Sequence, residues 1–149
     1  MNTLVSVKLA LVAFWGLWYL IAFSTNLCEG LRALRILPQT WPFASGNLGG
    51  ITQAMKTYSA SLSLSVLFFC GVLCWQLLCV ILFGWAIVSS LSAESLNLRA
   101  VNVAFLGGLG LWAAFMIADE ILKQYEVEHS HVLFFIAQLV TFIAIYALP

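Results

Sequence analysis

The sequence predicts an all-α membrane protein with four transmembrane helices and a long, partly helical first loop. Hydrophobic residues make up 63% of the 149 residues and charged residues only 8%, whereas about a quarter of a typical soluble domain is charged. Four apolar segments, at about residues 4–23, 61–88, 98–122 and 132–148, have the length of a membrane span. The links between the last three are short, so these spans should be antiparallel neighbours within a single domain. The net charge of zero gives no indication of a nucleic-acid partner.

The first span precedes the long loop, residues 24–60. It carries Trp15, Trp18 and Tyr19 and exceeds the apolar core of a signal peptide, so we expect a retained membrane helix. In the loop, the polar run 24–26 can cap a short amphipathic helix whose apolar face would consist of Leu27, Leu31 and Leu34. A second short helix is predicted over residues 51–58, with a re-entrant hairpin as the alternative.

The second span contains one strongly polar side chain, Gln76, within the apolar run 61–88. Hydrocarbon offers an amide no hydrogen-bond partner, so another helix must supply one near the middle of the membrane. Gln138 and Thr141 of the fourth span lie three residues apart and can share one helical face. We therefore predict that Gln76 closes an interhelical hydrogen bond with them.

The third span presents small residues at every fourth position, Ala100, Ala104 and Gly108. Such a row lets two helix backbones approach closely. The pattern fits packing inside this bundle and equally fits docking to another subunit.

Two carboxylates, Asp119 and Glu120, end the third span. Lys123 follows at helical spacing from both, which predicts an intrahelical ion pair and an interfacial anchor. The alternative is a proton-handling carboxylate at the mouth of a cavity, close in sequence to His129 and His131.

Metal-binding and catalytic motifs are missing from the sequence. The four cysteines and two histidines have neither the spacing of a zinc site nor that of a nucleophile–base pair. We expect no metal site, no catalytic residues and no cofactor that belongs to this chain alone.

Several of these residues carry a resemblance to a family of small bacterial integral membrane proteins known as DUF2165. Asn26 matches an asparagine that follows the first span in that family, and Asp119-Glu120 resembles its Gly-Glu element at the end of the third span. Trp75-Gln76 stands where the family tends to have Trp-Glu. The resemblance implies a similar fold in a bacterial membrane, and an amide at position 76 argues against proton chemistry there.

These features predict a non-catalytic accessory subunit of a larger membrane complex in respiratory or photosynthetic electron transfer. Its partners would be other integral membrane subunits and the lipid bilayer, with contacts to lipid, pigment or quinone, in a bacterial inner (cytoplasmic) or photosynthetic membrane. One alternative is a small transporter or channel, with a water path past Glu120 to Gln76. Another is an interfacial enzyme acting on lipid or quinone.

Overall fold

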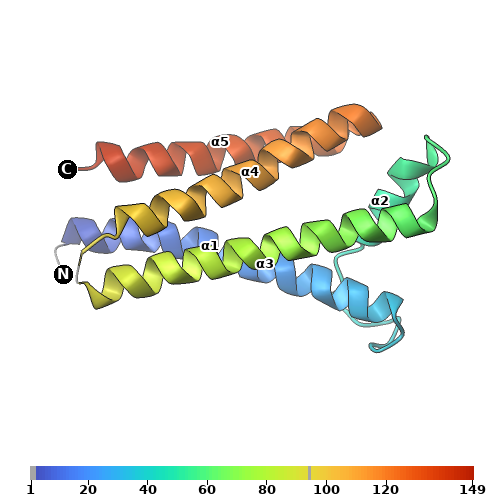
Figure 1. Cartoon of the computed structure of the whole chain (residues 1–149), viewed down its shortest axis with the longest axis horizontal. Helices are drawn as coiled ribbons and strands as arrows, with labels where there is room; N and C mark the ends of the chain where they lie inside the picture. Colours follow the sequence, from blue (N-terminus) through green and yellow to red (C-terminus); the bar gives the residue numbers. More distant parts are fainter. Residues whose placement is uncertain (1–2, 94) are drawn as a thin grey trace.

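The computed structural model describes residues 3–93 and 95–149, and the described residues form five helices and no strand (Figure 1). The helices are α1 Thr3–Ala33, α2 Asn47–Lys56, α3 Leu62–Ser92, α4 Leu98–Leu122 and α5 Tyr125–Ala147. All except α2 are long and apolar enough to cross a membrane. This confirms the predicted fold class, a multi-pass membrane protein with four spans and a partly helical first loop.

The four long helices run along one direction, with the start of α1 and the end of α5 at the same end of the bundle (Figure 1). We call this the terminal end; the Lys8 ammonium donates a hydrogen bond to the Leu148 carbonyl there, at 2.8 Å. The opposite end, here the loop end, carries α2 and the turn between α4 and α5. α1 packs mainly on α3, α3 on α4 and α4 on α5.

α1 differs from the prediction because it continues without a break through residues 24–33. The Ser24 hydroxyl donates to the Leu20 carbonyl at 2.7 Å, and the Thr25 hydroxyl donates to that of Ala22 at 3.0 Å. These side chains therefore bond back along the same helix and do not cap a new one. The predicted separate helix is wrong because Asn26 and Glu29 are buried in tertiary contacts. The second predicted loop helix exists as α2, and it begins four residues earlier than expected.

Charged residues mark two levels along the bundle. Lys8 and Glu29 in α1, and likewise Arg99 and Asp119 in α4, are separated by about 30 Å at the rise of an α-helix. This is the thickness of the hydrocarbon core of a bilayer. Glu29 and Asp119 therefore lie near the boundary at the loop end.

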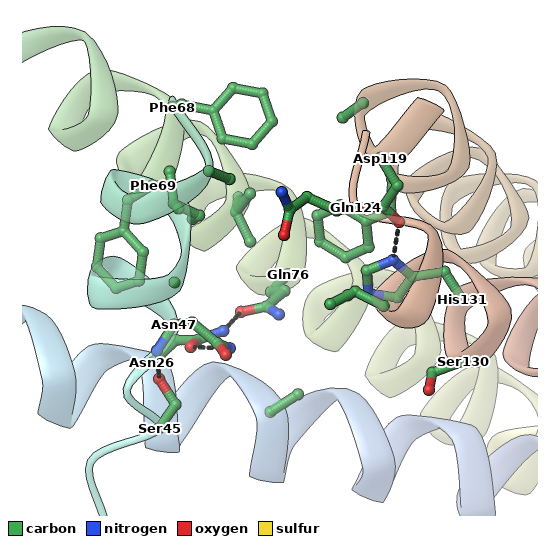
Figure 2. A pocket seen from close by; sticks show the side chains of 18 of the residues that line it. Asn26, Ser45, Asn47, Phe68, Phe69, Gln76, Asp119, Gln124, Ser130 and His131 are labelled. Carbon is green, nitrogen blue, oxygen red and sulfur yellow. Dashed lines mark hydrogen bonds and ion pairs between the residues drawn. The ribbon is translucent and has the colours of Figure 1, made fainter. Parts of the chain in front are cut away.

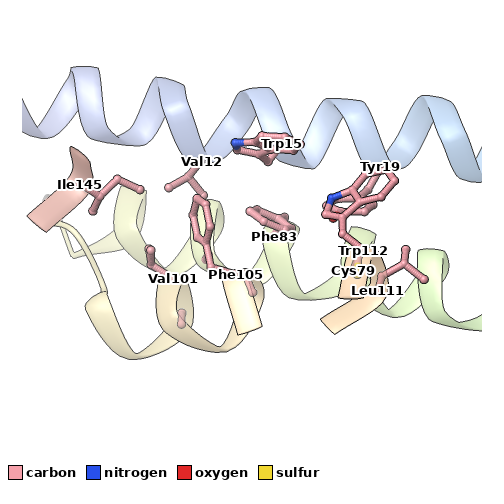
Figure 3. Close-up of a cluster of buried hydrophobic side chains, with 13 residues drawn as sticks. Val12, Trp15, Tyr19, Cys79, Phe83, Val101, Phe105, Leu111, Trp112 and Ile145 are labelled. Carbon is pink, nitrogen blue, oxygen red and sulfur yellow. The ribbon is translucent and has the colours of Figure 1, made fainter. Parts of the chain in front are cut away.

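The centre of the bundle is closely packed with large side chains (Figure 3). The ring of Phe83 stacks on Tyr19 with centroids 5.5 Å apart and meets Phe105 edge-on at 5.3 Å. Ala100 and Ala104 are fully buried beside this cluster. A Cβ atom on Gly108 would lie 2.4 Å from Nε2 of Gln138. The small-residue row of α4 is thus used for packing inside the bundle, which was one of its two predicted uses.

Candidate ligand-binding pocket

A pocket of about 460 Å³ lies at the loop end, with walls from all five helices (Figure 2). Its volume falls in the range of small-molecule sites. Aromatic side chains supply much of its surface: Trp18, Phe68, Phe69, Trp112, Phe115 and Phe134. Its amide and ionisable groups are Asn26, Asn47, Gln76, Gln124, Asp119 and His131.

Three amides form a chain of hydrogen bonds on one side of the pocket. Nδ2 of Asn47 donates to Oδ1 of Asn26 at 2.8 Å, and Nδ2 of Asn26 donates to Oε1 of Gln76 at 2.9 Å. Among the described residues, none accepts a hydrogen bond from Nε2 of Gln76. This nitrogen points away from Asn26, towards the side of the pocket that holds Asp119 and His131 (Figure 2). The chain therefore presents a hydrogen-bond donor to the pocket.

The predicted partners of Gln76 are wrong. Gln138 instead accepts a hydrogen bond from the Tyr19 hydroxyl at 3.1 Å, and the Thr141 hydroxyl bonds back to the Ala137 carbonyl of its own helix at 2.7 Å. The predicted depth holds, because Gln76 lies midway along α3 and the neighbouring Trp75 indole donates to the Gly107 carbonyl of α4, about 18 Å along that helix from Asp119. Asn26 was missed because the sequence placed it in the loop, outside the first span.

Asp119 and His131 form the other polar side of the pocket. Oδ2 of Asp119 lies 2.5 Å from Nδ1 of His131, and the imidazole stacks on Phe115 with ring centroids 4.7 Å apart. A tight turn brings α4 and α5 together here, with Lys123 in the left-handed conformation at φ 56°. The turn is closed by a hydrogen bond from the backbone N–H of Gln124 to the backbone carbonyl of Asp119 at 2.8 Å.

The predicted ion pair of Lys123 with Asp119 and Glu120 is therefore wrong. Within the described residues, Asp119 pairs with His131, and Lys123 pairs with neither carboxylate. Lys123 ends the helix, so its side chain no longer follows the helical spacing that the prediction assumed. Glu120 is exposed and does not line the pocket, and His129 is exposed as well. Of the two carboxylates, Asp119 is the one at a cavity.

The start of α2 is held over the pocket by the end of α1. Oε2 of Glu29 accepts hydrogen bonds from the Gly46 amide at 2.9 Å and from Arg32 at 2.7 Å. The Ser45 amide bonds to the Thr25 carbonyl at 3.2 Å. Gly46 has φ 80°, which the absence of a Cβ atom permits, and it directs the chain into α2. Docking of the loop thus depends on polar groups of α1.

Replacing Asn26 by leucine should release the start of α2. The substitution removes the hydrogen bonds that join Asn26 to Asn47 and to Gln76, and it leaves Oε1 of Gln76 without its donor. The docked loop therefore loses part of its stabilisation. Hydrogen exchange measured by mass spectrometry should show faster exchange of residues 45–50. The matched control is Asn102→Leu, since Asn102 lies in α4, outside the pocket, and bonds to Tyr146. Unchanged exchange in the Asn26 variant would contradict the role assigned to the amide chain.

The pocket is confined to the loop-end half of the bundle. Its lining residues come from positions 18–26 of α1, 68–76 of α3, 112–122 of α4 and 127–134 of α5, together with residues 45–54 and Gln124. Towards the terminal end lies the packed core of Tyr19, Phe83 and Phe105. Asp119 and His131 are the only ionisable side chains among the described lining residues, and they pair with each other.

Comparisons of the chain with family models, with curated proteins and with solved structures found no match, so its function is argued from this pocket.

Proposed function

We propose that the protein binds a neutral amphipathic small molecule in the loop-end pocket. One observation carries the proposal: an aromatic-walled pocket in the loop-end half of the bundle offers an unpaired Gln76 donor, while its two ionisable groups pair with each other. Aromatic walls favour an apolar or ring-containing body, and the donor favours an oxygen acceptor. No Lys or Arg is among the described lining residues, so an anionic head group would be buried without a counter-charge.

The position of the pocket supports binding more than conduction. A transporter or channel needs access from both faces of the membrane, and the described lining residues all belong to the loop-end half. The packed core of Tyr19, Phe83 and Phe105 lies between the pocket and the terminal end of the bundle. Glu120, the expected entrance of a water path to Gln76, is not among the lining residues.

The role of an accessory subunit in an electron-transfer complex stays a prediction, as does the resemblance to DUF2165. One reason for that role is weakened, because Ala100, Ala104 and Gly108 are buried inside the bundle, so this row of small residues is not open to a partner subunit. A binding protein for a membrane-soluble molecule is compatible with assembly into a complex. We assign no reaction to the pocket.

A fluorescent ligand can test the proposal. The purified protein in phosphatidylcholine nanodiscs should bind decanol with a terminal pyrene saturably, at one molecule per chain. The corresponding pyrene-labelled decanoate should bind at least about tenfold more weakly, because its charge lacks a partner in the pocket.

Two matched variants separate the pocket from the lipid-facing surface. Ala118 lines the pocket, whereas Ala137 is exposed on α5 and does not. Ala118→Phe should abolish saturable binding by filling the pocket, and Ala137→Phe should leave it unchanged. Binding that is non-saturable in the wild type, or equal in the two variants, would overturn the proposed function.

A further inference from the structure

Building on the proposed function, we infer that the ligand's head is a planar ring with oxygens on opposite sides, as in a quinone. One ring oxygen accepts a hydrogen bond from Nε2 of Gln76, and the opposite oxygen meets the imidazole of His131. The two groups belong to different sides of the pocket, the first to α3 and the second to α5 (Figure 2).

The Gln76 side of the pocket requires a hydrogen-bond acceptor on the ligand. Its Oε1 is already occupied by Asn26, and Asn26 is held in turn by Asn47. This chain fixes the orientation of the Gln76 amide, so that its NH₂ group is left to face the ligand. A carbonyl oxygen satisfies such a donor, whereas a purely hydrocarbon ring would leave the NH₂ group of Gln76, a residue only 6% exposed, without an acceptor.

The His131 side can serve either oxidation state of such a ring. Nδ1 of His131 lies against the Asp119 carboxylate, so Nε2 is the nitrogen left for a ligand. A protonated imidazole donates from Nε2 to a carbonyl, and a neutral one accepts at Nε2 from a hydroxyl. None of the described residues bonds to this nitrogen.

Between the two polar sides, the wall presents flat surfaces. Trp112 stacks on Phe134 with centroids 4.9 Å apart and an interplanar angle of 16°, and Phe115 stacks on His131 at 27°. A planar head group can extend such stacking, whereas a bulky tetrahedral head cannot. The cations Arg32 and Lys56 line a separate groove between α1 and α2, so they do not attract a phosphate into this pocket.

The test is competition against pyrene-labelled decanol in the same nanodiscs, with decylubiquinone and decylbenzene as competitors. Both carry a ring and a ten-carbon tail, and only decylubiquinone carries ring oxygens. Decylubiquinone should compete at least about tenfold more strongly. Gln76→Leu should lower the preference for decylubiquinone over decylbenzene about tenfold, a ratio that does not depend on how tightly the probe binds the variant.

A second variant guards against a folding defect. Gln76→Glu keeps an acceptor for Asn26 and replaces the donor by an oxygen, so it should weaken decylubiquinone even more than Gln76→Leu. Thr141→Val, which changes a polar residue outside the pocket, should have no effect. Equal competition by the two molecules, or unchanged decylubiquinone affinity in both Gln76 variants, would overturn the inferred head group while the proposed function stands. Failure of pyrene-labelled decanol to bind the wild type would overturn the proposed function itself.

Discussion

Replacing Gly108 by alanine should lower the free energy of unfolding by roughly 3 kcal/mol, through overpacking and a lost buried hydrogen bond. The added Cβ atom would lie 2.4 Å from Nε2 of Gln138 and 2.7 Å from the hydroxyl oxygen of Tyr19. Both side chains are almost completely buried and are joined by a 3.1 Å hydrogen bond. Neither can move aside without breaking that bond or displacing the aromatic core.

Thermal unfolding in detergent, followed by tryptophan fluorescence, would measure the effect. Gly71→Ala is the matched control, because a Cβ atom there meets nothing within 4 Å and alanine favours the helix. The double variant Gly108→Ala/Gln138→Ala should lose less stability than the sum of its single variants, since truncating Gln138 makes room for the methyl group. Equal melting temperatures for Gly108→Ala and Gly71→Ala would refute the close packing of α4 on α5.

Replacing His131 by phenylalanine should cost about 2 kcal/mol, the order found when a largely buried polar group loses its hydrogen-bond partner. Phenylalanine can still stack on Phe115, so the substitution mainly removes the partner of the Asp119 carboxylate. That carboxylate is 11% exposed and would keep a charge without compensation. Chemical unfolding monitored by circular dichroism would measure the loss.

Two further variants identify the cause of this loss. His131→Phe combined with Asp119→Asn should recover part of the stability, because the double variant no longer buries an unpaired charge. His129→Phe changes an exposed histidine two residues away and should stay within about 0.5 kcal/mol of the wild type. If the double variant is no more stable than His131→Phe alone, the contribution of His131 is one of packing and not of charge.

Hydropathy alone predicted the four spans and the long loop, because a bilayer demands about 20 consecutive apolar residues from each helix. It also predicted that Gln76 must have a partner, since hydrocarbon cannot satisfy an amide. It did not predict that α1 continues to Ala33, because a polar run such as Ser24, Thr25 and Asn26 can either cap a new helix or lie within a continuous one. Burial of Asn26 against Gln76 resolves that ambiguity.

The polar pairs themselves were decided by the tertiary structure. The sequence determined that Gln76, Gln138 and Asp119 need partners, and only the bundle determined that these are Asn26, Tyr19 and His131. The physical reason is that lipid is as apolar as the protein core, so hydropathy marks a span without marking which face points inward. The order and rotation of the helices set those faces, and with them the polar sides of the pocket.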